Sequence, residues 1–192
     1  MNNTTNIMIV GVGGQGTLLA SRILGGAVIR EGYDVKVSEV HGMSQRGGSV
    51  VTYVKYGEKV YSPIIDKGEA DIILAFELLE AYRALPWLKP GGVIIVNDQK
   101  INPMPVITCA AQYPQDILDK LLQKVNVTSL DALKLAKEAG SIKAVNVVLI
   151  GVMAKTTAIP YESWIETVKS TVPPKFLEVN LKAFELGYNF KG

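Results

Sequence analysis

Two polar, glycine-rich segments carry most of the chemistry that this sequence can offer. The first is the run GVGGQGT, and the second is the run HGMSQRGG. Each follows an apolar segment typical of a buried strand, so each is expected to form a loop at one end of a sheet. Such loops expose backbone N–H groups and polar side chains where open α/β folds bind ligands. The candidate site residues, none of them assigned as catalytic or as a metal ligand, are Gly11, Gly13, Gly14, Gln15, Gly16, Thr17, His41, Ser44, Gln45, Arg46, Gly47 and Gly48.

The glycine-rich loop has three interpretations on its residues alone. Its spacing satisfies the G-x-G-x-x-G pattern of dinucleotide-binding loops, and Glu39 stands near the place of a ribose-binding acid. The same spacing begins a Walker A loop, but no lysine precedes Thr17, so a P-loop ATPase or kinase is disfavoured. In the third interpretation the glycines only allow a tight turn and close helix packing. Gln15 then adds an amide that suits a ligand or a partner's backbone.

The second loop contains the only histidine of the chain, His41. A hydrolase triad with Ser44 would need a nucleophile elbow and a third member, and the sequence provides neither. Arg46, followed by two glycines, can offer a bidentate fork to a phosphate or carboxylate. The alternative is a structural arginine that pairs with Glu39 or with a C-terminal carbonyl group.

The elements that must position these loops alternate between strand and helix. The patterns predict an α/β fold with a doubly wound, mainly parallel, Rossmann-like sheet and a helical C-terminal third, in a single domain over residues 1–192. Expected strands are 6–10, 33–40, 49–56, 59–62, 70–76, 93–97 and 125–128. Expected helices are 16–31, 77–85, 115–123, 130–139, 144–154, 161–170 and one from residue 174.

Composition excludes several classes of function. A hydrophobic content of 48% and a net charge of +2 without a Lys/Arg cluster indicate a folded protein and disfavour nucleic acid or a membrane as partner. No signal segment or membrane span is evident, so a cytoplasmic location is expected. One cysteine and one histidine cannot supply the ligands of an iron–sulfur cluster or a structural zinc site.

A few single residues have a structural interpretation. Cys109 lies in an apolar run and is expected to be a small buried residue. Trp87, Trp164 and Phe176 are expected to anchor the core or an interface. Asn146 lies in an otherwise apolar helix, so it needs a hydrogen-bond partner. It either holds a loop at the end of the sheet or caps an adjacent helix.

Four motifs together resemble the gamma-type domain of the 2-oxoacid:ferredoxin oxidoreductase family. They are GVGGQGTLLASRILGGA, EVHGMSQRGGSVVTYVKYG, ADIILAFELLEA and KAVNVVLIGVMA, and the resemblance runs from about Ile7 to Tyr188. The HGMSQRGG form is most similar to the indolepyruvate branch of that family. Branches that act on pyruvate, 2-oxoglutarate or branched-chain 2-oxoacids tend to carry a different loop before RGG, and they remain the alternative.

This resemblance implies a division of labour between subunits. The family decarboxylates a 2-oxoacid on thiamine diphosphate, transfers the acyl group to coenzyme A and passes electrons through 4Fe–4S clusters to ferredoxin. The resemblance implies that an alpha subunit holds the thiamine diphosphate and the clusters. It also implies that this chain is inactive alone and completes the assembly. The two loops are then expected to face the partner, near the thiamine diphosphate or the coenzyme A path. Arg46 is the candidate for an anionic contact, and His41 and Gln45 are candidates for polar positioning.

Two alternatives come from other classes of function. A free-standing NAD(P)-dependent oxidoreductase would need a catalytic acid or base, for which only His41 or a tyrosine such as Tyr53 is available. A regulatory module would hold a nucleotide on the same glycine-rich loop. Neither alternative accounts for the HGMSQRGG segment.

Overall fold

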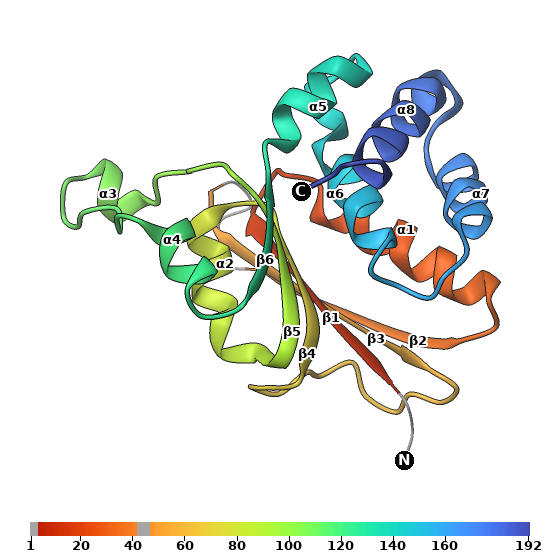
Figure 1. The fold of residues 1–192 in the computed structure, drawn as a ribbon, viewed down its shortest axis with the longest axis horizontal. Helices are drawn as coiled ribbons and strands as arrows, with labels where there is room; N and C mark the ends of the chain where they lie inside the picture. The colour runs from red at the N-terminus through yellow and green to blue at the C-terminus, as the bar shows by residue number, and fades with distance from the viewer. Residues whose placement is uncertain (1–3, 42–46) are drawn as a thin grey trace.

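The computed structural model describes residues 4–41 and 47–192, and these form a six-stranded sheet covered by helices on both faces (Figure 1). The strand order is β2-β3-β1-β4-β5-β6. The strands are β1 (Thr5–Val12), β2 (Asp34–His41), β3 (Ser49–Gly57), β4 (Ala70–Ala75), β5 (Leu88–Asn97) and β6 (Asn126–Leu130). Strands β1, β4, β5 and β6 pair in parallel, whereas β3 runs antiparallel to both β1 and β2. The predicted α/β fold with a mainly parallel sheet is therefore confirmed.

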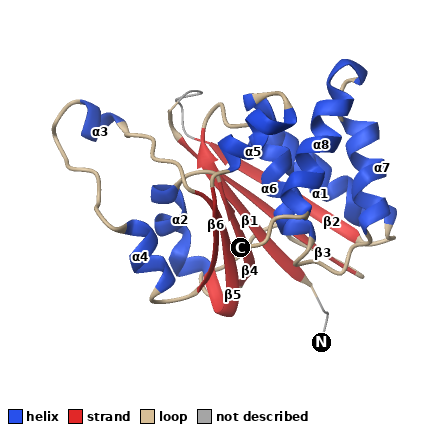
Figure 2. Ribbon diagram, turned by 45° about the horizontal axis from the view of Figure 1, so that its top comes forward, coloured by secondary structure: helices blue, strands red, loops and turns tan. Residues whose placement is uncertain are grey.

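The helices fall into two groups that cover opposite faces of the sheet (Figure 2). One face carries α1 (Thr17–Arg30), α5 (Ala132–Ala139), α6 (Val145–Ala154), α7 (Tyr161–Thr171) and α8 (Leu177–Tyr188). The other face carries α2 (Leu78–Ala84) and α4 (Ile117–Leu122), while α3 (Met104–Ile107) stands apart from both. Three short 3-10 turns complete the chain, η1 (Leu85–Trp87), η2 (Ile142–Ala144) and η3 (Pro174–Phe176). No helix in the described part of the chain is both long and apolar enough to cross a membrane.

The apolar run of β1 explains why this strand lies at the centre of the sheet. Successive side chains of a strand point to opposite faces. Ile7 and Ile9 therefore enter the core under α1 and α6, and Met8 and Val10 enter the core under α2. A strand that is buried on both faces needs a continuous apolar run, and the sequence provides one here.

The helical C-terminal third is built on the unusually close approach of α6 and α8. Residues 146–154 of α6 are all buried. A Cβ atom added to Gly187 would lie 2.0 Å from the carbonyl oxygen of Val148. A Cβ atom added to Gly151 would lie 2.3 Å from the carbonyl oxygen of Phe184. Because only glycine tolerates such distances, the two backbones pack directly against each other.

The predicted strand over residues 59–62 is wrong. That segment forms an irregular connection, because the Val60 N–H donates to a carboxylate oxygen of Asp34 at 2.9 Å rather than to a neighbouring strand. The hydrogen bonds from Lys36 and Val60 also lower the pKa of the Asp34 carboxyl below its usual value. Strand β3 therefore ends at Gly57, which pairs with Asp34.

The expectation for Cys109 also needs correction, and that for Phe176 is narrowed. Cys109 is exposed, and its backbone adopts a positive φ of 59°, so it is not a small buried residue. Phe176 is 48% exposed, so it does not anchor the core, and its expected role at an interface stays a prediction. Trp164, in contrast, is fully buried and stacks near Phe184, as expected.

Candidate functional site

The glycine-rich loop turns the chain from β1 into α1 at the end of the sheet where β1, β4, β5 and β6 finish, here called the carboxyl end of the sheet. Gly14 and Gly16 have φ angles of 101° and 83°, in the left-handed region that favours glycine. Gly16 also serves as the N-cap residue of α1. The turn thus depends on glycine for its backbone conformation.

Gln15 folds back over its own loop and joins it to the neighbouring strands. Its Oε1 accepts a hydrogen bond from the Val12 N–H at 2.7 Å, and its Nε2 donates to the Phe76 carbonyl at 3.1 Å. The same Nε2 lies 3.4 Å from Oε1 of Gln99, which follows β5. A Cβ atom on Gly11 would lie 2.8 Å from the Gln15 Oε1. The amide of Gln15 therefore occupies the space that Gly11 leaves free.

Asn146 holds the same loop from the helical side. It is 4% exposed, and its Nδ2 donates to the Gly16 carbonyl at 3.2 Å. A Cβ atom on Gly16 would lie 2.6 Å from that nitrogen. Of the two roles expected for this asparagine, the structure confirms that it holds a loop at the end of the sheet.

The structure brings the two sequence motifs together at the carboxyl end of the sheet. The Gly13 N–H donates to the Gly48 carbonyl at 2.8 Å. His41 pairs with Val50 in the sheet, and Val50 pairs in turn with Gly11. The candidates Ser44, Gln45 and Arg46 lie outside the described residues, and so does the side chain of His41.

The strand order argues against a dinucleotide site at this loop. In dinucleotide-binding folds the acid that binds the ribose ends the strand beside the first strand. Here the antiparallel strand β3 separates β1 from β2, so Glu39 lies on the outermost strand. Its carboxylate accepts a hydrogen bond from the Thr52 hydroxyl at 3.3 Å. Together with the position of Gln15, this geometry disfavours the dinucleotide interpretation.

A cavity of about 450 Å³ opens beside the glycine-rich loop. It is lined by Gly14 to Gly16, by Gln99 and Ile101 after β5, and by Lys143 and its neighbours before α6. Lys143 is exposed, so its ammonium group can meet an anion from solvent or from a partner. Sequence reasoning did not single out Gln99 or Lys143, although Lys143 begins the motif KAVNVVLIGVMA.

Glu77 is a buried carboxylate that organises the same end of the sheet. It is 1% exposed and caps α2, since its Oε2 accepts a hydrogen bond from the Glu80 N–H at 2.9 Å. Its Oε1 accepts from the Ile101 N–H at 3.1 Å and from the Tyr113 hydroxyl at 2.5 Å. Burial raises the pKa of the Tyr113 phenol well above its usual value, and the hydrogen bond to Glu77 adds to this rise. Tyr113 therefore stays protonated and donates to Glu77.

Glu80 connects helix α2 to the end of the second motif. It is 4% exposed, and its Oε2 accepts a hydrogen bond from the Ser49 hydroxyl at 2.5 Å. Its Oε1 forms an ion pair with Arg83 at 2.6 Å. Because Ser49 directly follows Gly47 and Gly48, this contact fixes the end of the HGMSQRGG segment against α2.

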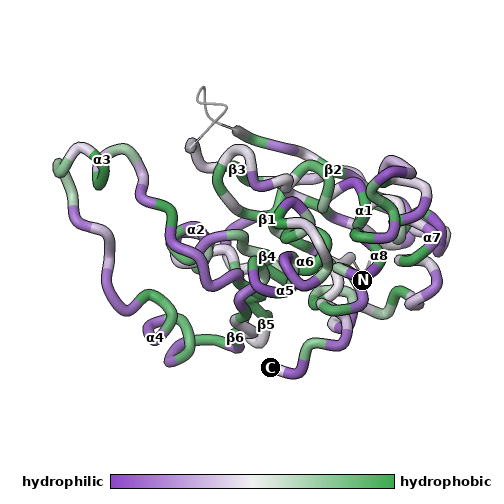
Figure 3. The backbone as a smooth tube through the Cα atoms, turned by 90° about the horizontal axis from the view of Figure 1, so that it is seen from above, coloured by the Kyte–Doolittle hydropathy of each residue, from purple (hydrophilic) through white to green (hydrophobic). Residues whose placement is uncertain are grey.

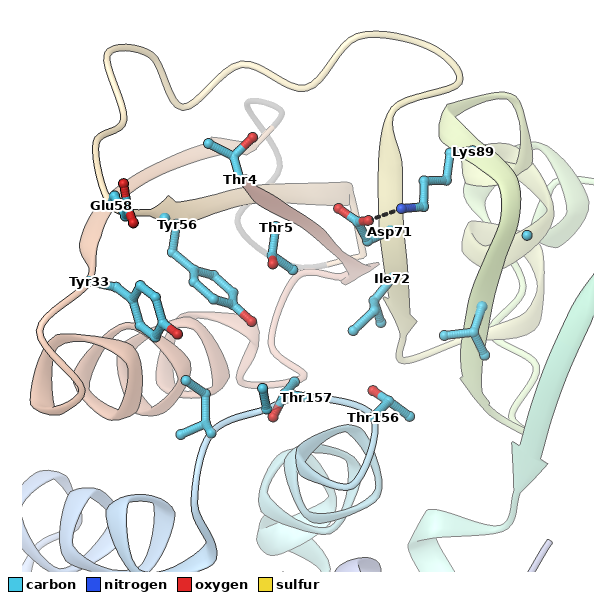
Figure 4. Close-up of a pocket in the computed structure, with 15 residues that line it drawn as sticks. Thr4, Thr5, Tyr33, Tyr56, Glu58, Asp71, Ile72, Lys89, Thr156 and Thr157 are labelled. Atoms are coloured by element: carbon cyan, nitrogen blue, oxygen red, sulfur yellow. Dashed lines mark hydrogen bonds and ion pairs between the residues drawn. The ribbon is translucent and has the colours of Figure 1, made fainter. Parts of the chain in front are cut away.

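A larger cavity, of about 620 Å³, lies at the opposite end of the sheet (Figure 4). Four of its polar side chains are paired within the chain, those of Asp71, Lys89, Thr156 and Thr157. Asp71 accepts a hydrogen bond from the Asn6 N–H at 2.6 Å and pairs with Lys89. The hydroxyls of Thr156 and Thr157 donate to carbonyl groups at the end of α6. The cavity beside the glycine-rich loop is the better candidate, because the sequence motifs that carry the family resemblance converge there.

Within residues 4–41 and 47–192, no group of three or more His, Cys, Asp or Glu side chains is arranged to hold a metal ion. The amides of Gln15 and Asn146 are already hydrogen-bonded within the chain, so Lys143 is the exposed cationic group that this cavity offers to a ligand or partner. The residues described here do not form a nucleophile–base pair at this site.

Comparison with known proteins places these features in a family. The sequence model described as "Pyruvate ferredoxin/flavodoxin oxidoreductase" matches residues 6–190. The indolepyruvate oxidoreductase subunit IorB of Thermococcus kodakarensis is 47% identical over 188 residues, which cover 95% of this chain and 93% of that protein. The common gamma subunit of the pyruvate/ketoisovalerate oxidoreductases of the same organism is 30% identical over 183 residues, covering 93% and 92%.

A solved structure extends this similarity to three dimensions. The gamma subunit of a keto/oxoacid ferredoxin oxidoreductase from Geobacter sulfurreducens superimposes with a TM-score of 0.72 at 27% identity. The match covers 96% of each chain.

Proposed function

Since this chain belongs to the pyruvate ferredoxin/flavodoxin oxidoreductase family, we propose that it is a subunit of an oxidoreductase that acts on indolepyruvate. The complex would convert the 2-oxoacid and coenzyme A to an acyl-CoA and carbon dioxide, and would pass the electrons to ferredoxin. The supporting observation is the 47% identity to an IorB subunit, against 30% to a gamma subunit of the pyruvate/ketoisovalerate enzymes.

The proposal assigns the redox chemistry to a larger, alpha subunit. With one cysteine and one histidine, this chain lacks the four ligands that an iron–sulfur cluster requires. Thiamine diphosphate and the 4Fe–4S clusters would therefore reside in the alpha subunit, where thiamine diphosphate supplies the carbanion chemistry of decarboxylation. This chain would complete the site by presenting its two loops to that subunit.

The residues of this chain would bind and position rather than react. Gln15 and Asn146 hold the glycine-rich loop in one conformation, so its shape is formed before a ligand or partner arrives. Arg46 and Lys143 are the proposed contacts for anionic groups of coenzyme A or the substrate, and His41 and Gln45 are the proposed polar positioning groups.

The test is capture of the tagged chain from its own cells under anoxic conditions. Iron, thiamine diphosphate and indolepyruvate-dependent dye reduction with coenzyme A are then measured in the captured complex. The proposal predicts a brown, thiamine-containing complex that prefers indolepyruvate over pyruvate, 2-oxoglutarate and branched-chain 2-oxoacids. A complex that prefers one of those other acids would place the chain in another branch of the family. A colourless chain captured alone that binds NAD(P)H would contradict the proposal.

Arg46→Ala tests the anionic contact within that complex. Hydrogen bonds to charged groups contribute about 1.5–3 kcal/mol, so the KM for coenzyme A or for the 2-oxoacid should rise about tenfold or more. The iron and thiamine diphosphate content should remain at the wild-type level, which separates this effect from a failure of assembly.

A further inference from the structure

An arm of residues 101–115 leaves the body of the protein between β5 and α4 (Figure 1). Its sequence, INPMPVITCAAQYPQ, contains no Asp, Glu, Lys or Arg. None of its residues is buried, and Met104 and Ile107 are 64% and 60% exposed. The arm with α3 extends beyond α2 and α4, away from the sheet (Figure 3). It is thus an apolar, uncharged and exposed segment.

The tip of the arm is folded upon itself. Around the single turn of α3, the N–H of Thr108 donates to the Met104 carbonyl at 2.9 Å, and that of Ala111 donates to the Pro105 carbonyl at 3.0 Å. Prolines at positions 103, 105 and 114 restrict the backbone further. A segment that is ordered before binding loses less conformational entropy when it docks.

Both ends of the arm are held by one buried carboxylate. The Glu77 Oε1 accepts hydrogen bonds from the Ile101 N–H, where the arm begins, and from the Tyr113 hydroxyl, where it ends. Glu77 itself is fixed at the start of α2 and is 1% exposed. This arrangement, here called the Glu77 clasp, sets the direction in which the arm leaves the body.

The composition of the arm is that of an interface rather than a solvated loop. Interface cores are depleted in charged residues and enriched in methionine and aromatic residues, and exposed apolar segments of this kind mark interaction sites. The arm begins at Ile101, which lines the cavity beside Gly14 and Gly16 together with Gln99. The arm therefore continues the surface of the two glycine-rich loops, which would face the alpha subunit under the proposed function.

We propose that residues 101–115 form a docking arm that inserts Met104 and Ile107 into an apolar groove of the alpha subunit. The Glu77 clasp holds the arm in the docking orientation. This inference rests on the proposed function, because that function supplies the partner. It goes further in assigning the assembly contact to an arm outside the two glycine-rich motifs.

The main test introduces a charge at the tip of the arm. Ile107→Asp and a matched control, Ile64→Asp, are each co-expressed with the alpha subunit. Ile64 is 52% exposed and lies in the connection between β3 and β4, at the opposite end of the sheet. Burial of an unpaired carboxylate in an apolar groove should weaken assembly by Ile107→Asp at least tenfold, whereas Ile64→Asp should assemble like the wild type.

The outcomes separate this inference from the proposed function. If the wild-type chain does not assemble with a thiamine-containing subunit, the proposed function fails. If the wild type assembles and Ile107→Asp assembles equally well, only the docking arm is overturned. If Ile107→Asp disrupts a dimer of this chain while leaving the alpha subunit bound, the arm docks on a second copy and the assigned partner is wrong.

Cys109 supplies a second readout that does not depend on activity. It is the only cysteine of the chain, and it is exposed on the arm. Maleimide labelling of the peptide that contains Cys109 is followed by mass spectrometry in the free chain and in the complex. Docking predicts at least tenfold slower labelling in the complex, and equal rates would overturn the inference.

Discussion

The glycine-rich loop and the α6–α8 contact both rely on glycine to bring two parts of the chain together, but they do so for different reasons. At the loop, Gly11 and Gly16 leave room for the amide side chains of Gln15 and Asn146. Between the helices, Gly151 and Gly187 leave room for the opposing backbone itself. The loop is thus held by a few directed hydrogen bonds, and the helical layer is held by apolar packing over a large area.

This difference predicts how each region responds to substitution. Packed interiors transmit a local clash to their neighbours, because side chains and backbones there have no free space. A hydrogen-bonded loop at the end of a sheet can lose one bond and shift locally. We therefore expect the helical layer to control global stability and the carboxyl end of the sheet to control assembly and activity.

The largest effect is expected for Gly187→Ala. The added Cβ would lie 2.0 Å from the Val148 carbonyl oxygen, and no rotamer change can relieve a clash with backbone. Overpacking of this kind should destabilise the protein by about 3 kcal/mol or more, measured by urea unfolding. The control is Gly25→Ala in α1, where an added Cβ would meet no atom within 4 Å apart from its chain neighbours and the backbone of its own helix. That change should stabilise by about 0.5–1 kcal/mol, because alanine favours helix. Equal effects at both positions would contradict the claim that the close backbone contact between α6 and α8 requires glycine.

A smaller loss, of about 2–3 kcal/mol, is expected for Glu77→Ala. The substitution leaves the N–H groups of Glu80 and Ile101 without their acceptor at a buried site. It should also speed hydrogen exchange in the arm of residues 101–115 selectively. Glu58→Ala, at an exposed position, should stay within about 0.5 kcal/mol of the wild type. Unchanged exchange in the arm would contradict the Glu77 clasp.

Asn146→Ala should cost about 1–2 kcal/mol, since it removes the donor to the Gly16 carbonyl. Asn146→Asp serves as the isosteric comparison, because a carboxylate cannot donate that bond and should cost a similar amount. Both variants should lower the activity of the complex more than their effect on stability explains. Full activity in either variant would show that the position of the glycine-rich loop is unimportant.

The smallest effect is expected for Trp164→Phe, a loss of about 1 kcal/mol in the free energy of unfolding. Trp164 is fully buried in the helical layer, and its Nε1 has no hydrogen-bond partner within the described residues. Replacing it with phenylalanine removes that unsatisfied donor while keeping an aromatic ring next to Phe184. A loss of about 3 kcal/mol or more would mean that the lost volume of the indole ring outweighs removal of its unsatisfied N–H.

The sequence predicted the elements whose patterns are local. The continuous apolar runs of β1, β4 and β5 indicated strands buried on both faces, and the helical C-terminal third followed from its apolar stripes. The antiparallel direction of β3 was not specified, because an alternating pattern is the same in either direction. Residues 59–62 resembled a strand, but the side chain of Asp34 takes the N–H of Val60.

The candidate site was predictable only in part, because some of its contacts join residues that are far apart in the sequence. Asn146 could be singled out because a polar residue in an apolar helix needs a partner. The role of Glu77 could not, since its contacts with Ile101 and Tyr113 join residues far apart in the sequence. Cys109 was misplaced because its apolar run lies on the exposed arm of residues 101–115 and not in the core.

The most direct test of the account is a titration of this chain into the purified alpha subunit under anoxic conditions, with indolepyruvate-dependent reduction of ferredoxin as the readout. The account predicts little activity from either subunit alone and a saturable rise in rate as this chain is added, in the presence of coenzyme A. Full activity of the alpha subunit without this chain would contradict it.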